Sequence, residues 1–282
     1  RKASSAASDV YKRQQLDPLN HTEPHIMKKL LGPACFAALL ALFAAGCATT
    51  EVEEPIPVDI TLEELQSKMT RAMDPTGRYA KAKTYTMQQT TSTERFLDDP
   101  EVQRVEVKFA RPDSFSLTTY EDNEPLSGMI VNGKNGWVAD YRRRKVVQLD
   151  GKQLEQLKML SSIASPDSTY GKIFASAELS GCRIDGKDYY KITCLHREPD
   201  QGPTEIYVDR EEFLPRRWKT TFKAGNNRVD YDSRIDKYSL RDGVMIPEET
   251  TTVQNGHKQT TTVTYYRLNT AISPRTFRPP LF

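Results

Sequence analysis

Histidine and cysteine are scarce in this chain, which has four of each among its 282 residues. Only His196 and His257 follow residue 47, and neither stands in a cluster with the spacing of metal ligands. The chain after residue 47 also lacks the H-x-x-x-H and C-x-x-C spacings, a G-x-S-x-G nucleophile motif and a glycine-rich phosphate loop. We therefore expect no metal site, no cofactor and no catalytic residues, and nothing in the sequence points to an enzyme.

The chain also lacks a large excess of positive or of negative charge. The formal net charge is only +2 at pH 7, whereas nucleic-acid-binding proteins concentrate basic charge on one face. The one dense basic run, residues 142–145, stands between Tyr141 and Val146 at an expected hairpin tip. A solvated turn is the simpler interpretation of this run, and contact with anionic lipid headgroups is the alternative.

One long apolar run is present near the start of the chain. Met27-Lys28-Lys29 supplies positive charge, and residues 30–46 are uncharged and end in small residues. This run is slightly too short to cross a bilayer and has the pattern of a secretion signal. Its end, LFAAGC at residues 42–47, resembles the bacterial lipobox, in which the cysteine takes a diacylglyceryl group. We expect a lipoprotein signal peptide at 27–46 and lipidation of Cys47; the alternative is an ordinary signal peptide with an incidental cysteine.

The residues on either side of this leader also carry predictions. Ala48 follows Cys47 where an aspartate would signal inner-membrane retention, which favours an anchor in the outer membrane with the domain facing the periplasm. Residues 1–26 precede the positive start of the leader and resemble translated adapter sequence, so we expect them to be non-native. Residues 47–58 contain three glutamates and two prolines, a composition typical of a flexible linker.

The remaining residues, 59–282, predict one domain that is mainly β. Thr61 and Glu64 match a capping box before an apolar stripe that ends near Pro75. Asp150 is the expected start of a second helix, with Leu154, Leu157 and Leu160 as its apolar stripe. Alternating patterns predict strands at about 83–91, 101–110, 114–121, 127–132, 136–141, 145–149, 177–184, 188–196, 203–209, 214–223, 227–238, 245–253 and 257–268. Short turns between them, such as Asn255-Gly256, indicate antiparallel pairing.

Cys182 and Cys194 remain once the leader and the lipidated residue are set aside. An oxidising periplasm permits a disulfide between them. If Asp185-Gly186 is a two-residue hairpin turn, however, Cys182 faces Tyr189 and Cys194 lies too far along its strand to form the bond. A disulfide requires a longer loop or a strand that bends back, and both alternatives stay open.

Several short patterns together resemble one known family. In chain order they are FARPDSF at 109–115, IVNGKNGWV at 130–138, GKDYYKI at 186–192, VDREEFLPRRW at 208–218, and LNTAI at 268–272 followed by Phe277 and Pro279. Their order and spacing, with the lipobox, resemble the LolA/LolB-like family of outer-membrane lipoprotein-sorting proteins over roughly residues 60–280.

This resemblance implies a strongly curved antiparallel sheet that forms a half-open barrel of about 11 strands, with helices covering an apolar cavity. It implies that the cavity binds acyl chains of lipoproteins or other lipids, in exchange with the outer membrane and possibly a soluble periplasmic carrier. The residues expected to line the cavity are apolar and lie on these strands and helices: Leu65, Met69, Phe109, Phe115, Leu117, Trp137, Leu157, Leu160, Ile206, Val208 and Trp218. For each residue, ordinary packing in the core is the alternative. An envelope sensor on the same fold is the alternative function, and a hydrolase is the least favoured.

Overall fold

The computed structural model describes residues 52–94, 100–151, 153–155, 157–158, 166, 169–197, 201–224 and 227–282. The expected leader, the lipidation residue Cys47 and the helix residue Leu160 lie outside the described residues. In the described part of the chain, no helix combines the length and the apolar character that a membrane crossing needs.

The strands form one sheet of fourteen strands in the order β1-β8-β9-β10-β11-β12-β13-β14-β2-β3-β4-β5-β6-β7. Their bounds are β1 Glu54–Ile56, β2 Thr84–Thr93, β3 Glu101–Ala110, β4 Ser114–Glu121, β5 Glu124–Asn132, β6 Asn135–Asp140, β7 Lys145–Gln148, β8 Ser176–Ile184, β9 Lys187–Leu195, β10 Thr204–Asp209, β11 Pro215–Ala224, β12 Asn227–Arg241, β13 Val244–Gln254 and β14 His257–Leu268. The prediction of a mainly β, antiparallel fold is confirmed. The sheet has fourteen strands, whereas the alternating patterns predicted thirteen and the family resemblance about eleven.

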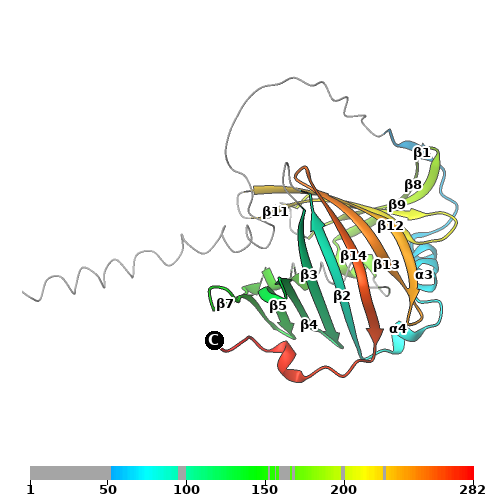
Figure 1. Ribbon diagram of the computed structural model, residues 1–282. Helices are drawn as coiled ribbons and strands as arrows, with labels where there is room; N and C mark the ends of the chain where they lie inside the picture. The colour runs from blue at the N-terminus through cyan, green and yellow to red at the C-terminus, as the bar shows by residue number, and fades with distance from the viewer. Residues whose placement is uncertain are drawn as a thin grey trace, which may run out of the picture. The chain divides into compact units, whose positions relative to one another are not determined.

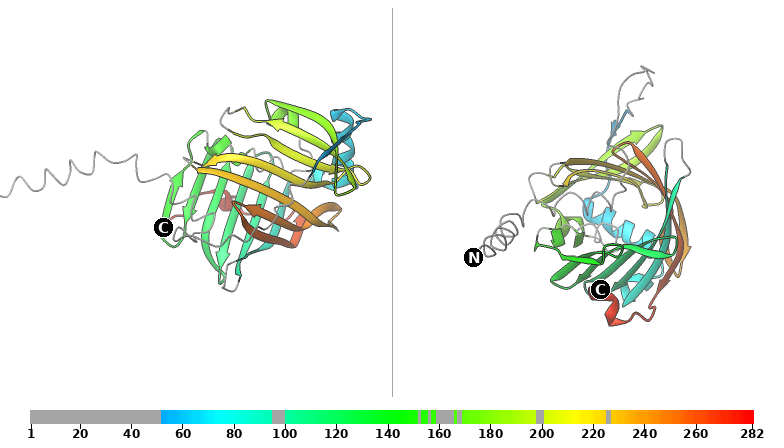
Figure 2. Two further views of the ribbon diagram at one scale, coloured as in Figure 1. Left: turned by 90° about the horizontal axis from the view of Figure 1, so that it is seen from above. Right: turned by 60° about the vertical axis from the view of Figure 1, so that its left-hand side comes forward.

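The sheet is strongly curved and not closed. Its two ends are β1 and β7, which are not paired with each other in the described residues. Figure 1 shows β2, β3, β4 and β5 side by side, and Figure 2 shows the sheet bending around helix α3, Leu62–Met73. The curvature gives the sheet a concave face, which α3 partly covers, and a convex outer face.

Helix α3 begins at the predicted capping box. The amide of Glu64 donates to Oγ1 of Thr61 at 3.2 Å, and the amide of Thr61 donates to Oε2 of Glu64 at 2.8 Å. These two bonds satisfy backbone donors that the first turn of a helix leaves free. Gly77, at φ 64°, then turns the chain into the short helix α4, Arg78–Lys81.

Three further short helical segments follow. The second predicted helix is present where it is described, at 151, 153–155 and 157–158, and Asp150 and Gln153 form a reciprocal cap. Helix α6 spans Tyr170–Ile173, and the 3-10 helix η1 spans Pro274–Phe277 near the C-terminus. Phe277 is buried, and η1 contacts β4 and β5.

Tight turns set the register of the hairpins. Asn255 and Gly256 have φ values of 49° and 83°, and Asp185 and Gly186 have values of 50° and 77°. Two positive φ values in succession match the right-handed twist of the flanking strands, which is why Asn-Gly and Asp-Gly are favoured there. As predicted from the second turn, Cys182 lies opposite Tyr189.

This register also decides the state of the two cysteines, which are both free and buried. Cys194 pairs with Ala177 of β8, at a position about 16 Å along that strand from Cys182. Ala177 and Cys182 are an odd number of residues apart, so the two thiols lie on opposite faces of the sheet. The disulfide considered for Cys182 and Cys194 is therefore absent.

The N-terminal segment, residues 52–60, differs from the expected flexible linker. Glu54–Ile56 adds β1 to the edge of β8, with Glu54 opposite Arg183 and Ile56 opposite Gly181. Nη2 of Arg210 donates to the carbonyl of Pro57 at 2.5 Å, and the hydroxyl of Tyr190 donates to Oδ1 of Asp59 at 2.9 Å. This part of residues 47–58 is ordered structure, which corrects the prediction of a spacer through residue 58.

Candidate functional site

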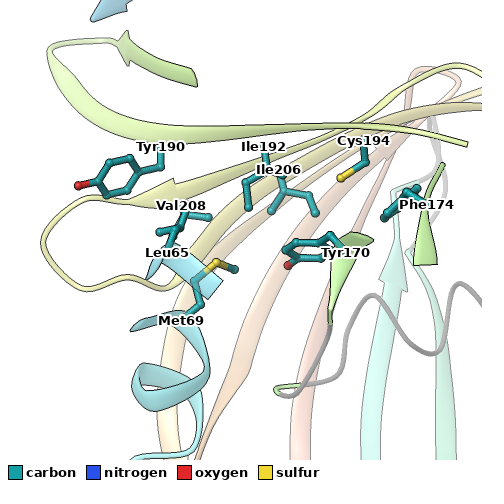
Figure 3. Close-up of a cluster of buried hydrophobic side chains, with 9 residues drawn as sticks. All are labelled: Leu65, Met69, Tyr170, Phe174, Tyr190, Ile192, Cys194, Ile206 and Val208. Carbon is teal, nitrogen blue, oxygen red and sulfur yellow. The ribbon is translucent and has the colours of Figure 1, made fainter. Parts of the chain in front are cut away.

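Five of the predicted lining residues come together beneath α3. Leu65 and Met69 of the helix pack on Ile206 and Val208 of β10, and Trp218 of β11 packs against the same cluster. Figure 3 shows the helix side chains of Leu65 and Met69 facing the side chains of β10, beside Tyr170 and Phe174 of the α6 region. Leu65 and Val208 are 0% exposed, Ile206 2% and Met69 4%. In this region the concave face is therefore filled by the protein's own helix.

The face that α3 covers can be followed around the sheet by register. Trp218 pairs with Ile206, and its ring lies 5.7 Å from that of Tyr231 on β12. On the opposite face of β11 and β12, Arg217 forms an ion pair with Asp232. The concave face thus passes from Tyr231 through its partner Gln254 and onward across β13, β14 and β2. Side chains alternate between faces along each strand, and the pairing shifts by one residue at β-bulges such as that after Val263, so the concave positions follow from the paired residues.

Two complete apolar rows cross the concave face beyond α3. The first apolar row runs from β14 to β6 and contains Leu268, Tyr85, Phe109, Phe115, Val131 and Gly136. The second apolar row runs from β14 to β7 and contains Tyr266, Met87, Val107, Leu117, Met129, Val138 and Val147. Phe109, Phe115 and Leu117 were predicted from the sequence, and the structure places them here.

The second apolar row is incompletely covered. All of its members except Val107 keep part of their surface exposed, whereas Leu65, Met69, Ile206 and Val208 beneath α3 are buried. Tyr85 of the first row stacks on Phe109 at 5.1 Å and on Tyr266 at 5.7 Å between ring centroids. These rings form a rigid apolar surface that continues into the second row.

Trp137 does not belong to this face. It pairs with Ile130, in the row of Ser116 and Lys108, and its neighbours Gly136 and Val138 are the concave residues of β6. The prediction that Trp137 lines the cavity is corrected by this register. An aromatic residue in a strand indicates a packed position, but it does not say on which face.

The helix that begins at Asp150 covers the far end of the first apolar row. A Cβ atom on Gly136 would lie 2.8 Å from Cδ1 of Leu154, so this glycine lets the helix approach the sheet. Leu154 is buried, and the predicted residue Leu157 is half-buried. Leu160 lies outside the described residues.

Two polar rows continue the concave face toward the other end of the same strands. The first polar row contains Ile235, Thr250, Thr261, Thr91 and Gln103, and the second contains Ser233, Thr252, Gln259, Thr93 and Glu101. The hydroxyls of Thr91 and Thr261 lie 3.2 Å apart, and those of Ser233 and Thr252 lie 3.0 Å apart. Among these ten residues only Glu101, at the end of a row, carries a formal charge.

The outer face of the same strands is charged by contrast. Lys108 and Glu106 pair at 2.7 Å on β3, and the guanidinium of Arg104 lies 3.8 Å from the ring centroid of Tyr120. Oδ2 of Asp236 on β12 accepts a hydrogen bond of 2.7 Å from Oγ1 of Thr251 on β13. Apart from Glu101, these charged side chains therefore lie away from the concave face.

Two hydrogen-bond donors near this face have no partner among the residues that the structure describes. They are the indole Nε1 of Trp218 and the amide Nε2 of Gln66 on α3, and both atoms are buried. Buried donors are nearly always paired, so an unpaired one indicates a site for another molecule or for ordered water. Sequence reasoning missed Gln66, because only the folded helix shows that its amide is buried.

The described residues offer little for catalysis. Among them no group of three or more histidine, cysteine or acidic side chains could hold a metal ion. Burial raises the pKa of the Cys182 thiol to about 11 and lowers the pKa of His196, whose Nε2 lies 2.8 Å from Oγ1 of Thr204. A protonated, buried thiol is a poor nucleophile.

Comparison with known proteins identifies the fold. No protein-family model matches the sequence, and no curated protein matches it. Among solved structures, a LolA superfamily protein from Nitrosomonas europaea is similar with a TM-score of 0.55 and 13% identity, over 78% of this chain and 99% of that one. A DUF1329 family protein from Desulfovibrio piger has a TM-score of 0.53 and 12% identity, over 77% and 97%.

A third structure is a putative outer-membrane lipoprotein-sorting protein domain from Vibrio parahaemolyticus. Its TM-score is 0.50 at 8% identity, over 76% of this chain and 94% of that one. At such low identities the likeness concerns the fold and not the ligand. The curved, open antiparallel sheet of this chain is a LolA-like fold, as the sequence patterns predicted.

Proposed function

We propose that this protein binds acyl chains on the concave face of its sheet. The observation that carries the proposal is the second apolar row, which crosses seven strands without a polar residue other than the tyrosine at its end. At about 4.8 Å between strands, six intervals make this row about 29 Å long. Each CH₂ group that leaves water on such a surface contributes about 0.8 kcal/mol without any polar partner.

The proposed ligands are the acyl chains of lipoproteins or of another lipid, and the proposed role is outer-membrane lipoprotein sorting. Binding and release of an acyl chain need no covalent step and no cofactor, which agrees with the uncharged apolar rows of the concave face. The fold shared with a lipoprotein-sorting domain supports this assignment. A soluble periplasmic carrier that delivers the ligand is part of the proposal.

Lipidation of Cys47 completes the proposed arrangement. The sequence at residues 42–47 resembles a lipobox, and several acyl chains on one residue give stable attachment where one alone is marginal. With Ala48 next, we place the anchor in the outer membrane and the domain in the periplasm. The tether then holds an acyl-binding surface beside the bilayer that receives lipoproteins.

A fluorescent fatty acid whose emission rises in apolar surroundings tests the binding. The chain without its leader, carrying Cys47→Ser, is expected to give saturable fluorescence. Leu117→Thr or Val138→Thr places a hydroxyl on the second apolar row and is expected to weaken binding roughly 5- to 100-fold, since an unpaired buried hydroxyl costs about 1–3 kcal/mol.

Val102→Thr is the matched control, because Val102 is 56% exposed on the outer face of β3. Thermal unfolding of all variants checks that the sheet is intact. Absence of saturable binding by the unsubstituted chain, or an equal loss in Val102→Thr, contradicts the proposal.

A further inference from the structure

We infer that the polar part of the ligand is uncharged and is recognised by the two polar rows of the concave face. The inference rests on the proposed acyl-binding function and adds the chemical class of the head: an ester, amide or hydroxyl group without a phosphate or carboxylate. A monoacylglycerol has this chemistry.

Along single strands of the concave face, apolar residues are followed by polar residues. On the concave side of β2, Tyr85 and Met87 are followed by Gln89, Thr91 and Thr93. On β3 the order is likewise apolar and then polar, from Phe109, Val107 and Val105 to Gln103. An amphiphile whose chain lies on the apolar rows therefore has its head beside the polar rows.

The polar rows contain a single charged side chain and no basic one. Proteins bind phosphate and carboxylate groups with arginine, lysine or clusters of backbone amides. Apart from Ile235, the polar rows hold threonine, serine, glutamine and one charged residue, the acidic Glu101. Taking an anionic head out of water against these groups leaves its charge without a counterion, which is costly.

Two buried hydrogen-bond donors lie near the concave face. Nε1 of Trp218 and Nε2 of Gln66 can only donate, and neither has a partner in the described part of the chain. Trp218 lies on the concave face, against Tyr231 of β12, and Gln66 lies on α3, the helix that covers this face. A neutral carbonyl oxygen of an ester or amide accepts such bonds without bringing a charge into the site.

Competition for the bound fluorescent fatty acid tests the inference with three probes of equal chain length: 1-palmitoylglycerol, palmitate and 1-palmitoyl lysophosphatidate. We expect 1-palmitoylglycerol to displace the fluorescent probe at a concentration at least roughly tenfold lower than the lysophosphatidate, a ratio that corresponds to about 1.4 kcal/mol. Trp218→Phe, which keeps the ring and removes the donor, is expected to reduce this ratio.

The polar rows offer a matched pair of double variants. Thr91→Val with Thr261→Val removes two concave hydroxyls and is expected to abolish the preference for the glycerol ester. Thr90→Val with Thr262→Val changes the neighbouring cross-strand pair on the outer face and is expected to leave the preference unchanged.

The outcomes of the competition distinguish a failure of the inference about the polar head from a failure of the proposed acyl binding. If the three probes compete equally, or the lysophosphatidate competes best, the inference is overturned while acyl binding stands. An equal effect of the concave and outer variants overturns it as well. If no probe and no fatty acid binds, the proposed function fails and the inference fails with it.

Discussion

The phenolic hydroxyl of Tyr207 donates a hydrogen bond to Oε1 of Glu53, 2.5 Å away, although 154 residues separate the two in sequence. Tyr207 lies on the outer face of β10 and is 0% exposed. Oε2 of Glu205 lies 2.9 Å from the same hydroxyl, and Nζ of Lys191 lies 2.8 Å from Glu53 and 2.7 Å from Glu205. This group of side chains holds the N-terminal segment on the convex side of the sheet.

Tyr207→Phe is predicted to destabilise the protein by about 1.5–3 kcal/mol, because hydrogen bonds to charged acceptors contribute about that much. Urea unfolding measures the free energy. Tyr189→Phe is the control, since Tyr189 lies next to Tyr207 with ring centroids 6.4 Å apart and is predicted to tolerate the change. Equal stability of Tyr207→Phe and the unsubstituted protein would show that the bond to Glu53 contributes nothing.

Gly181→Val is predicted to release β1 from the sheet edge. A Cβ atom at residue 181 would lie 2.6 Å from the carbonyl oxygen of Ile56 and 2.5 Å from Nη2 of Arg210. Hydrogen exchange at the amides of Glu54 and Ile56 should rise in this variant and stay slow in Gly151→Ala, where nothing lies within 4 Å of the added Cβ atom.

The same variant has a consequence for the proposed membrane anchor. From Cys47 to Glu53 the extended chain spans about 20 Å, whereas from Cys47 to Thr61 it spans about 48 Å. In lipidated protein on vesicles, fluorescence transfer between the domain and the bilayer should therefore decrease in Gly181→Val. If hydrogen exchange in β1 becomes faster but fluorescence transfer is unchanged, the pairing of β1 with β8 does not set the distance between the domain and the bilayer.

Stability is predicted to fall at acid pH through Asp209. Burial alone would raise the pKa of this carboxyl, but the bond from Lys187 at 2.6 Å and those from the amides of Glu211 and Glu212 outweigh it and hold the pKa below its ordinary value. A pKa that folding lowers stabilises the protein above the unfolded value of about 3.9, and this contribution is lost as the pH falls through the folded value.

Denaturant unfolding at pH 7 and pH 3 measures this loss. Asp209→Asn should be less stable at pH 7 and should lose less stability between the two pH values. An unchanged pH dependence in this variant would assign the acid sensitivity to other carboxyls.

Cys182 and Cys194 are predicted to remain thiols in air-oxidised protein. Burial raises the pKa of Cys194 to about 12 and that of Cys182 to about 11, so both are protonated and shielded. In Cys47→Ser protein, iodoacetamide should add two groups after unfolding without reductant and far fewer before it, as counted by mass spectrometry. No addition in the unfolded protein would mean that the two are bridged.

Leu65 and Leu117 are predicted to respond differently to truncation. Leu65 is 0% exposed, so Leu65→Ala should cost about 2–5 kcal/mol of stability. Leu117 is half-buried on the second apolar row, so Leu117→Ala should cost clearly less in the free protein and should weaken acyl binding instead. A large stability loss in both variants would identify Leu117 as core.

Much of the fold follows from local patterns. The capping box at Thr61 and Glu64, the Asn-Gly and Asp-Gly turns and thirteen of the strands were predictable, because each depends on residues close in sequence. β1 could not be predicted. It is three residues long and contains Pro55, and its partner β8 begins about 120 residues later.

The candidate site was predictable only in part. Alternation identifies which residues of a strand share a face, but not which face is concave, and Trp137 was assigned to the wrong one for this reason. The neighbouring residues Met129 and Val138 were missed, although the register from the Asn132-Gly133 turn connects them across the hairpin. Phe109, Phe115 and Leu117 were found because their strands pair directly and share one alternation.

The sequence by itself determined the strands, the turns and the helix start, since these depend on side-chain periodicity and on backbone preferences within a few residues. Only the tertiary structure decided which side chains meet, because sheet curvature and long-range pairing depend on the whole chain. It placed α3 over Ile206 and Val208, left the second apolar row partly open, and buried Tyr207 beneath Glu53 on the opposite face.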